Sequence, residues 1–503
     1  MNNMKYGSIA TGSNESTETA LKILKQGGNA FDAAVGAVFT SMTSEFSLTG
    51  PFGGGTCIGS ENNGIPFTYD FFVDCPKIMN TKKEFKEVSV NFGKAIQNFH
   101  IGKGSIAVPG NILGLIKIHK NHGTLPLDIV LSYAIDYAFN GVIISSYQAY
   151  IMSLIKPIIT FEKNKLFYKN KSLINEGERF TNPAFGLFLK IILDKGPEYF
   201  YTGNGVEHIM DFLGNDSCLS LNDFSDYMVH KRRPISMNFQ DHTIYTNPAP
   251  SYGGTLIIFL LKLLKNREII SPFDIIKGMN LTTRVRNEIC KNPEDENEIN
   301  GILDIKIINK YKKIFSNKEF IFSSEKQGFG STTHVSVLDK NGNAASITTT
   351  NGEGCGRIIP KYGIMMNNML GEVDLNPYGF HNWNTKRRLP TMISPMLITK
   401  NGKNKFVLGS GGSNRIRSAN IQVILNLFSK NMNLFDAISS PRLHLEENIL
   451  YTEPNVNIPE IKLINKLSIK EFDNKHLFFG GVNAVSNNEA VGDTRRGGSG
   501  MIN

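Results

Sequence analysis

Two runs of β-branched residues in the last third of the chain constrain its fold more than any other feature. They are residues 332–338 and 344–350, and the sequence between them contains Asn341-Gly342. Asn-Gly between such runs is a strong short-range signal for a β-hairpin, because both residues tolerate the positive φ angles of a tight turn. The sequence therefore predicts two paired strands here.

The open end of this hairpin brings polar side chains together. A two-residue loop pairs Thr332 with Asn351, whereas a one-residue change in loop type pairs Thr332 with Thr350. In both registers Thr332 lies beside Thr350 and Asn351. Threonine is also a good strand residue, so the hairpin alone does not require any chemistry.

A threonine hydroxyl needs a base before it can act as a nucleophile. His334 lies two residues along the same strand and on the same face, so it is one candidate neighbour. The α-amino group of Thr332 itself is another, with an ordinary pKa of about 7.7–8. That second route requires the Ser331–Thr332 bond to be cut, which is testable.

Composition excludes several classes of protein. The 503 residues are 41% hydrophobic, enough for a sizeable core in one large or two medium domains. Lys and Arg number 54 against 45 Asp and Glu, and this net charge of +9 is not gathered into a basic stripe, so we expect no nucleic-acid partner. The most apolar run, residues 256–261, is far shorter than the roughly 18 residues of a membrane span, so we expect no membrane insertion.

The sequence also lacks the usual signals for a metal or cofactor. Its five cysteines are odd in number, widely spaced and never form CxxC, which argues against a disulfide framework or a zinc site. It contains neither an HExxH motif nor a phosphate-binding loop, so we expect no metal and no organic cofactor. The first residues lack the apolar stretch of a signal peptide, which predicts a cytoplasmic protein.

Hydrophobic spacing predicts helices near the start of the chain. Residues 18–26 carry an apolar stripe that ends at Gly27-Gly28, and a second helix begins at Ala30. The glycines of residues 50–55 predict a tight turn that enters a strand. From about residue 84 to 326 the pattern is mostly helical, and after it strands and helices mix.

With these elements placed, residues 332–344 resemble the autoprocessing segment of the γ-glutamyltransferases, which are N-terminal-nucleophile hydrolases. Further segments resemble motifs of that family and occur in its order: residues 24–35, 50–55, 107–110, 367–372, 408–413 and 493–498. Matches in sequence order are far more specific than any one of them. The resemblance extends over nearly the whole chain.

The resemblance implies a fold and a maturation step. The fold is of the α+β class, a four-layer αββα sandwich whose helices gather in the larger part. The chain would be made as one inactive precursor that cleaves itself before Thr332. The products would be a large chain of residues 1–331 and a small catalytic chain of residues 332–503, which together form one domain and a heterodimer. A dimer of heterodimers is a further assembly to expect.

The resemblance also assigns catalytic roles. Thr332 matches the nucleophile, and its freed amine would be the general base in forming a γ-glutamyl ester that water or an acceptor amine then releases. Thr350 matches a threonine that orients the nucleophile. Gly411 and Gly412 match the pair whose backbone N–H groups form the oxyanion hole, although a plain tight turn would also explain them.

Substrate-binding roles follow in the same way. Glu372 falls where the family holds an acid that binds the substrate's α-ammonium group. Thr391 falls on a serine that helps to bind the α-carboxylate, and Met392 replaces a second serine. Asn351 stands close to a family asparagine, with a one-residue gap in the match.

One departure concerns the arginine that clamps the α-carboxylate, because Phe72 stands at its position. Phenylalanine cannot replace the charge-assisted, bidentate bonds of a guanidinium. Either another cation such as Arg415 or Lys77 takes over, or the substrate is not an ordinary γ-glutamyl compound.

Three hypotheses follow. The first is an autoprocessed enzyme that cleaves γ-glutamyl amides, including glutathione. The second keeps the chemistry but changes the acyl group, as in the family's acylases. The third is an unprocessed, non-catalytic binding protein on the same fold, which would not need the set formed by Thr332, Thr350, Gly411 and Gly412.

Overall fold

The structure is a computed structural model of the whole chain. It describes residues 5–503 except for 79–82, 93, 95, 163–165, 170, 293–294, 318–319, 321, 323–331, 377–378, 383–386 and 459–466.

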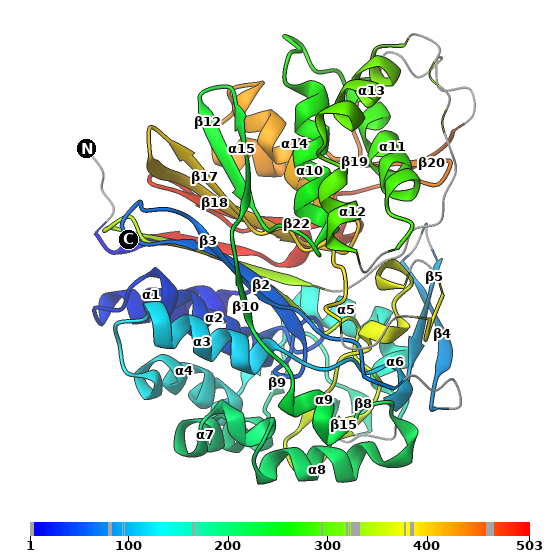
Figure 1. Cartoon of the computed structure of the whole chain (residues 1–503). Coiled ribbons are helices and arrows are strands. Elements are labelled where there is room, and N and C mark those ends of the chain that lie inside the picture. Colours follow the sequence, from blue (N-terminus) through cyan, green and yellow to red (C-terminus); the bar gives the residue numbers. More distant parts are fainter. Residues whose placement is uncertain are drawn as a thin grey trace.

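Two antiparallel sheets lie face to face at the centre of the molecule (Figure 1). The first has seven strands in the order β10 (His230–Arg232), β3 (Phe67–Phe71), β2 (Gly54–Ser60), β14 (Ala344–Thr350), β13 (Thr333–Asp339), β1 (Gly7–Thr11) and β24 (Ser499–Ile502). The second has six, in the order β11 (Ile235–Phe239), β12 (His242–Thr246), β17 (Met396–Lys400), β18 (Lys403–Gly411), β22 (Gly481–Ser486) and β23 (Ala490–Val491). Strand β18 of the second sheet contacts both β13 and β14 of the first.

Helices cover the outer face of each sheet, which confirms the predicted αββα sandwich (Figure 1). The layer on the first sheet contains α1 (Asn14–Lys25), α2 (Ala30–Ser44), α3 (Asn111–His122), α4 (Leu127–Asn140) and α7 (Pro183–Lys195). The layer on the second contains α10 (Tyr252–Leu264), α11 (Pro272–Ile289), α13 (Ile305–Ser316), α14 (Arg415–Phe428) and α15 (Leu434–Ser439). Among the described residues, helices α1 to α13 precede Thr332, so the larger part is the helix-rich one.

The remaining elements surround these layers. The helices are α5 (Ser146–Leu154), α6 (Lys156–Ile159), α8 (Asn204–Leu213), α9 (Leu221–Ser225) and α12 (Glu296–Gly301). The strands are β4 (Lys86–Asn91), β5 (Ile96–Ile101), β6 (Val142–Ile143), β7 (Tyr168–Lys169), β8 (Ser172–Leu173), β9 (Arg179–Phe180), β15 (Ile358–Ile359), β16 (Ile364–Met365), β19 (Leu443–Glu446), β20 (Ile449–Thr452) and β21 (Ser468–Glu471).

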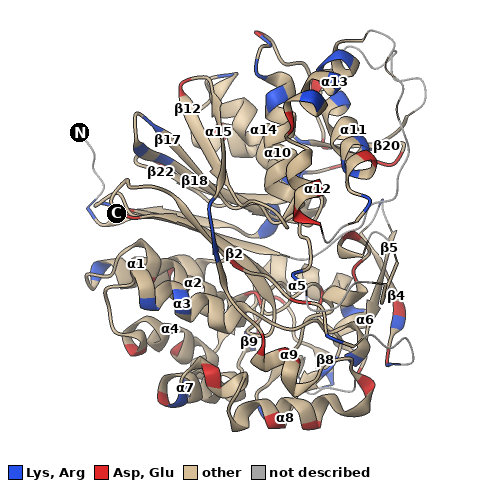
Figure 2. Ribbon diagram, viewed as in Figure 1, with Lys and Arg blue, Asp and Glu red and all other residues tan. Residues whose placement is uncertain are grey.

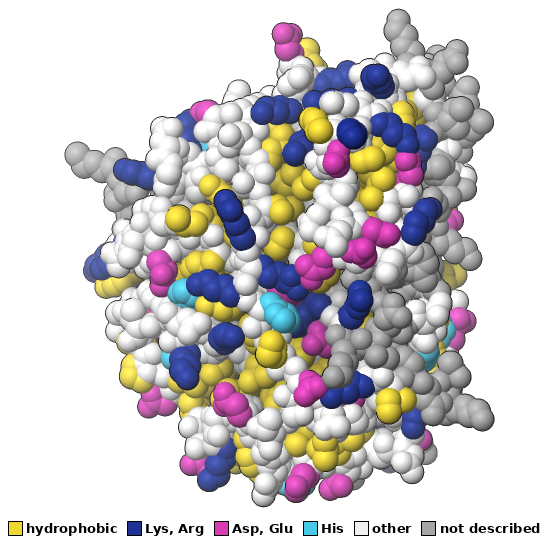
Figure 3. All heavy atoms as spheres, viewed as in Figure 1, with side chains coloured by type: hydrophobic (Ala, Val, Ile, Leu, Met, Phe, Trp, Pro, Cys, Tyr) yellow, Lys and Arg dark blue, Asp and Glu magenta, His cyan; other side chains and the backbone are white. Residues whose placement is uncertain are grey.

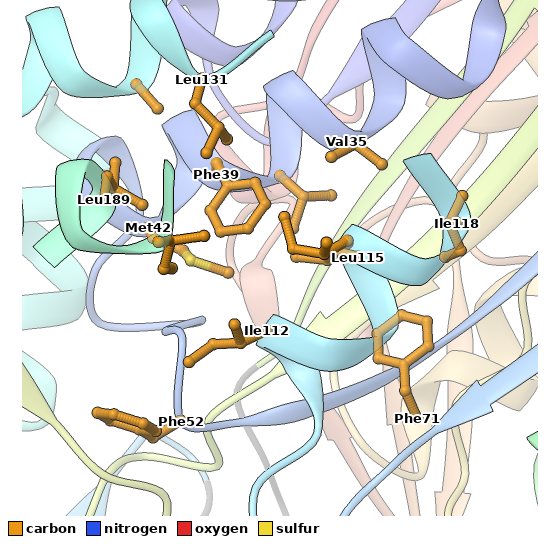
Figure 4. Close-up of a cluster of buried hydrophobic side chains, with 14 of the residues drawn as sticks. Val35, Phe39, Met42, Phe52, Phe71, Ile112, Leu115, Ile118, Leu131 and Leu189 are labelled. Carbon is orange, nitrogen blue, oxygen red and sulfur yellow. The ribbon is translucent and has the colours of Figure 1, made fainter. Parts of the chain in front are cut away.

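Helix α2 is buried along its whole length because it lies between the first sheet and the outer helix α4. Apart from Asp32 in its first turn, its side chains are small or apolar on every side, which is the pattern expected for a helix covered all round. Figure 4 shows Val35 and Phe39 of α2 facing Ile112 and Leu115 of α3. This cluster fixes the helical layer against β2, β3 and β13.

One predicted helix boundary is wrong, and one region contains strands besides its predicted helices. The first helix starts at Asn14 rather than near residue 18, because Ser13 caps it by accepting a hydrogen bond from the Ser16 N–H. The region predicted as mostly helical also holds the hairpin β4–β5 and the strands β10 to β12. The alternation of Ile235, Met237 and Phe239 with polar residues is the period-two signal for one of these strands.

The predicted hairpin is present, but its loop is longer than two residues. Leu338 pairs with Ala344, and the same register pairs Thr333 with Thr349, so Thr332 lies opposite Thr350. The Asp339 carboxylate shapes the loop by accepting hydrogen bonds from backbone N–H groups at residues 341 and 343. Of the two predicted registers, the one that pairs Thr332 with Thr350 is therefore correct.

Both sheets combine strands from before and after Thr332. In the first sheet, β14 and β13 lie between β2 and β1, and β24 follows β1 at the edge. In the second, β12 pairs with β17. Neither part of the chain therefore completes a sheet alone.

Charged residues of both signs are spread over the helices and loops (Figure 2). The face in Figure 3 shows them interspersed in the same way. None of the helices in the described residues combines the length and the apolar character that a membrane crossing would need.

We predict that Asp339→Ala lowers the free energy of unfolding by about 3 kcal/mol, because several charge-assisted hydrogen bonds from backbone N–H groups are lost. The lost bonds include the one from Ala30 N–H, which joins the loop to the start of α2 at 3.0 Å. Urea unfolding followed by circular dichroism measures the change. The exposed Lys340→Ala in the same loop is the control, and equal midpoints for the two variants would contradict the prediction.

Candidate functional site

Residues far apart in the sequence meet at one small cavity. Thr332, which is 4% exposed, lines it just before β13. Four other predicted site residues line the same cavity: Thr350, Glu372, Thr391 and Met392. The remaining lining residues are Phe72, Met369, Leu375, Ile393, Ser413 and Ile416. The structure thus brings together most of the predicted set.

Gly411 approaches Thr332 from the second sheet. A methyl group in place of its hydrogen would lie 2.0 Å from the Thr332 carbonyl oxygen, so only glycine fits. Gly412 follows with a φ of +119°, a backbone conformation that residues other than glycine rarely adopt. The chain therefore turns sharply beside Thr332, as a pair of converging backbone N–H donors requires.

Gly412 itself lines a neighbouring cavity that also contains Arg415, Arg496 and Glu353. The Arg496 guanidinium lies over the turn, with one nitrogen 2.9 Å from the place of a Gly412 Cβ. Sequence reasoning missed Arg496 and Glu353 as neighbours of this turn, since their roles depend on which segments pack together.

The Thr350 hydroxyl accepts a hydrogen bond of 3.0 Å from the Gly352 N–H. A hydroxyl can accept one hydrogen bond and donate another, so this bond is compatible with the orienting role predicted for Thr350. Gly352 has a φ of +61°, and a Cβ there would lie 2.4 Å from a Glu372 carboxylate oxygen. This glycine lets the end of β14 approach Glu372.

Asn351 is buried but does not line the Thr332 cavity. Its side-chain amide donates to the Met365 carbonyl at 3.1 Å, and its backbone N–H donates to the Leu48 carbonyl. In this structure Asn351 joins the end of β14 to β16 and to the segment that holds Leu48, and the substrate contact predicted for it stays a prediction.

Glu372 is a buried acid in an acidic neighbourhood. Burial raises its pKa well above the usual glutamate value, and the nearby carboxyl groups of Glu353 and Asp374 raise it further. Asp374 in turn accepts a hydrogen bond from the Ser413 hydroxyl. A cationic group bound in this cavity would stabilise the ionised form of Glu372, so the site favours a ligand with a positive charge.

Thr391 and Met392 form the opposite part of the lining. The Thr391 hydroxyl accepts a hydrogen bond from the Ile393 N–H at 3.2 Å, and its carbonyl accepts one from the Ser251 hydroxyl. These bonds fix Thr391 at the edge of the cavity. Met392 adds an apolar side chain to the lining, at the position where the family's second serine would add a hydroxyl.

Phe72 is 1% exposed and lies in the cavity wall. Its carbonyl oxygen accepts hydrogen bonds from the Tyr227 hydroxyl, at 2.7 Å, and from the Arg388 guanidinium. Arg388 therefore holds the backbone of Phe72 and is absent from the residues that line the cavity.

The two cations suggested as replacements for the missing arginine are engaged elsewhere. Lys77 pairs with Asp226 at 2.6 Å in a different cavity, and Arg415 pairs with Glu446 at 2.9 Å. The described residues that line the Thr332 cavity include neither lysine nor arginine.

His334 does not serve Thr332 as a base in this structure. Its ring nitrogens lie 2.7 Å from the Thr348 hydroxyl and 2.9 Å from the Ser336 hydroxyl, between the two sheets. Burial lowers the pKa of His334 to about 3, so the ring stays neutral. The α-amino group of Thr332 is then the remaining candidate base.

Ser331 lies outside the described residues, so the bond predicted to be cut is described only on its Thr332 side. In the described part of the chain, His, Cys, Asp and Glu side chains nowhere form a group of three or more suited to a metal ion.

Comparison with known proteins adds independent observations. Residues 16–502 match the family model described as gamma-glutamyltranspeptidase. The capsule biosynthesis protein CapD proenzyme of Bacillus anthracis is 29% identical over 499 residues, covering 96% of this chain and 88% of that protein. The glutathione hydrolase proenzyme of Pseudomonas aeruginosa is 28% identical over 466 residues, covering 87% and 82%.

Among solved structures, cephalosporin acylase from Bacillus halodurans has a TM-score of 0.83 at 19% identity and covers 99% of this chain and 96% of its own. The γ-glutamyltranspeptidase of Helicobacter pylori has a TM-score of 0.53 at 24% identity, over 62% and 93%. Both likenesses concern the fold.

The raised pKa of Glu372 predicts how stability changes with pH. Between the ordinary glutamate pKa and the raised one, the folded protein binds a proton that the unfolded chain does not, so stability falls as the pH rises through this window. We expect Glu372→Gln to remove part of this fall and to be more stable, relative to the wild type, at pH 8 than at pH 5.

Urea unfolding at the two pH values measures this difference, with the exposed Glu207→Gln as the control. An equal effect of Glu372→Gln at both pH values would contradict the prediction.

Proposed function

The chain belongs to the γ-glutamyltranspeptidase family, and on that premise we propose that it cleaves γ-glutamyl amide bonds, as in glutathione and related compounds. Members of this family are N-terminal-nucleophile hydrolases made as proenzymes, and this chain is such an enzyme. The observation that carries the proposal is the meeting of Thr332, Thr350, Glu372 and Thr391 at one cavity.

Maturation would start with attack of the Thr332 hydroxyl oxygen on the carbonyl carbon of Ser331. The Ser331–Thr332 C–N bond breaks, the amine takes the hydroxyl proton, and an ester joins the two parts. Water then hydrolyses the ester. The products are the chains of residues 1–331 and 332–503, a heterodimer, and Thr332 gains a free α-amino group.

In each catalytic cycle the amine of Thr332 would accept the proton of its own hydroxyl, whose oxygen attacks the γ-carbonyl carbon of the substrate. The N–H groups at the Gly411–Gly412 turn would stabilise the negative oxygen that develops. The same proton then leaves with the amine product. Water or an acceptor amine releases the glutamyl group from the ester and regenerates the hydroxyl.

Glu372 supports the γ-glutamyl assignment. A γ-glutamyl group carries an α-ammonium, and an ammonium beside Glu372 would compensate the cost of a buried carboxylate next to Glu353 and Asp374. A neutral acyl group would offer no such compensation. The Thr391 hydroxyl supplies a polar partner at the same cavity for the α-carboxylate.

A second candidate is an acylase that acts on an amide without a γ-glutamyl group. The observation that favours it is the apolar wall, in which Phe72 stands beside Met369, Leu375, Met392, Ile393 and Ile416. An apolar acyl chain would fill this space without needing a cation for its carboxylate.

We predict that the mature wild type runs as two chains on denaturing electrophoresis and that Thr332→Ala runs as one chain of 55.9 kDa. The variant lacks the oxygen that attacks Ser331, so it cannot start the cleavage. Thr202→Ala, at an exposed threonine, is the control and should be cut like the wild type. An uncut wild type would favour a non-catalytic binding protein instead.

Hydrolysis of a γ-glutamyl anilide, compared with simple acyl anilides, decides between the two substrate classes. We predict release of the aniline from the γ-glutamyl compound, at least tenfold faster than from the others, because only this substrate offers an ammonium to Glu372. Activity on the simple acyl anilides alone would establish the acylase assignment and remove the γ-glutamyl one.

A further inference from the structure

A buried carboxyl contacts the residue that follows the proposed nucleophile. The Thr333 hydroxyl donates to the Glu45 carboxyl oxygen at 2.5 Å, and Glu45 is only 1% exposed. Glu45 comes directly after α2, on the helical side of the first sheet. Because successive side chains of a strand point to opposite faces, Thr333 reaches Glu45 while Thr332 lines the cavity.

The same short segment also holds the other strand of the hairpin. The hydroxyls of Thr49 and Thr349 are 2.9 Å apart, and Thr349 is the ladder partner of Thr333. Residues 45–49 therefore contact β13 and β14 beside Thr332 and Thr350 respectively. These contacts come from a part of the chain that the proposed mechanism does not use.

Gly12, the residue after β1, closes a third side of the Glu45–Thr333 pair. A methyl group on Gly12 would lie 2.1 Å from the Glu45 carboxyl oxygen and 2.6 Å from the Thr333 hydroxyl. The pair is therefore enclosed by α2, β13 and the residue after β1. Such close packing leaves Thr333 little freedom to move.

Burying the Glu45 carboxyl costs free energy, because it is removed from water. Burial raises its pKa to about 7, although the hydroxyls of Thr333 and Ser13 oppose the shift. Glu15 of α1 raises it further, and Tyr147 of α5 is another titratable group within its field. Replacing a buried charged group by a well-packed apolar residue is often neutral or stabilising, so stability alone does not account for an acid at this position.

The proposed cleavage suggests a role for the contact between Glu45 and Thr333. Once the Ser331–Thr332 bond is cut, Thr332 becomes a chain end, and chain ends fray unless they are tied down. A nucleophile misplaced by about 1 Å can lose on the order of 100-fold in rate. Gly411 of the second sheet approaches the Thr332 carbonyl closely, and the contact between Thr333 and Glu45 is an attachment on the helical side.

We propose that Glu45 is a positioning residue for Thr332. Its carboxyl anchors the Thr333 hydroxyl and so keeps the backbone at the start of β13 close to Gly411. The proposal rests on the proposed role of Thr332 as the nucleophile. Glu45 does not touch the substrate, so its removal lowers the rate of the chemical steps and leaves substrate binding unchanged.

The experiment measures the rate of self-cleavage, and kcat and KM for whichever anilide the mature enzyme hydrolyses. Thr333→Val keeps the size of the side chain and removes the donor, whereas Glu45→Gln weakens the acceptor. We expect each to slow self-cleavage and lower kcat at least tenfold with KM unchanged. Gly12→Ala, which displaces the pair without removing either group, gives the same result.

Two further variants separate positioning from general destabilisation. Thr333→Ser retains the hydroxyl and restores the wild-type rates. Thr43→Val is the matched control, because Thr43 is a buried threonine of α2 whose hydroxyl has no hydrogen-bond partner among the described residues. Its kcat stays that of the wild type. The double variant Glu45→Gln/Thr333→Val is no slower than the slower single variant, since both changes break one contact.

Rates within twofold of the wild type for Thr333→Val and Glu45→Gln would overturn the proposal, as would additive effects in the double variant. Glu45 variants that do not fold still leave Thr333→Val and Thr333→Ser to decide. If Thr332→Ala is cut like the wild type, the proposed function itself fails. If Thr332→Ala stays uncut while Thr333→Val is as fast as the wild type, only the role of Glu45 fails.

Discussion

The close approach of Gly411 to the Thr332 carbonyl is the contact on which the rest of the site depends. It joins the end of β18 in one sheet to the beginning of β13 in the other, at a separation that no side chain at residue 411 would permit. The same closeness recurs inside the sandwich, where a methyl group on Gly409 would lie 2.4 Å from the His334 ring. Glycines along β18 thus bring the hairpin of the first sheet within reach of the turn that follows β18.

The cavity beside this contact combines an acidic environment with an apolar one. On one side lie Glu372 and the acids that raise its pKa. On the other lie Phe72 and a group of aliphatic and thioether side chains. A ligand that satisfies both environments would place a positive charge beside Glu372 and apolar surface against Phe72. Specificity in such a site comes from the cost of leaving a buried carboxylate unpaired.

Features that depend on neighbouring residues could be predicted from the sequence, whereas features that depend on distant partners could not. The hairpin follows from its β-branched runs, and the turn at Gly411 follows from its glycines. The register remained open because the Asp339 side chain, and not the Asn-Gly pair alone, shapes the loop. Lys77 and Arg415 carry charge in the sequence, but only the fold shows that Asp226 and Glu446 already pair with them. Glu45 has no local signature, because its partner Thr333 lies 288 residues away.

The alternation of strands from the two parts of the chain changes what the proposed cleavage means for folding. Pulling the two products apart would break the ladders of β2 with β14, of β1 with β13 and β24, and of β12 with β17. The cut therefore leaves the native assembly in place. Refolding, however, changes its molecularity: the precursor folds as one chain, whereas the separated products must first find each other, at a rate that depends on their concentration. After maturation the native assembly would persist, whereas refolding from the separated chains would be slower than folding of the precursor.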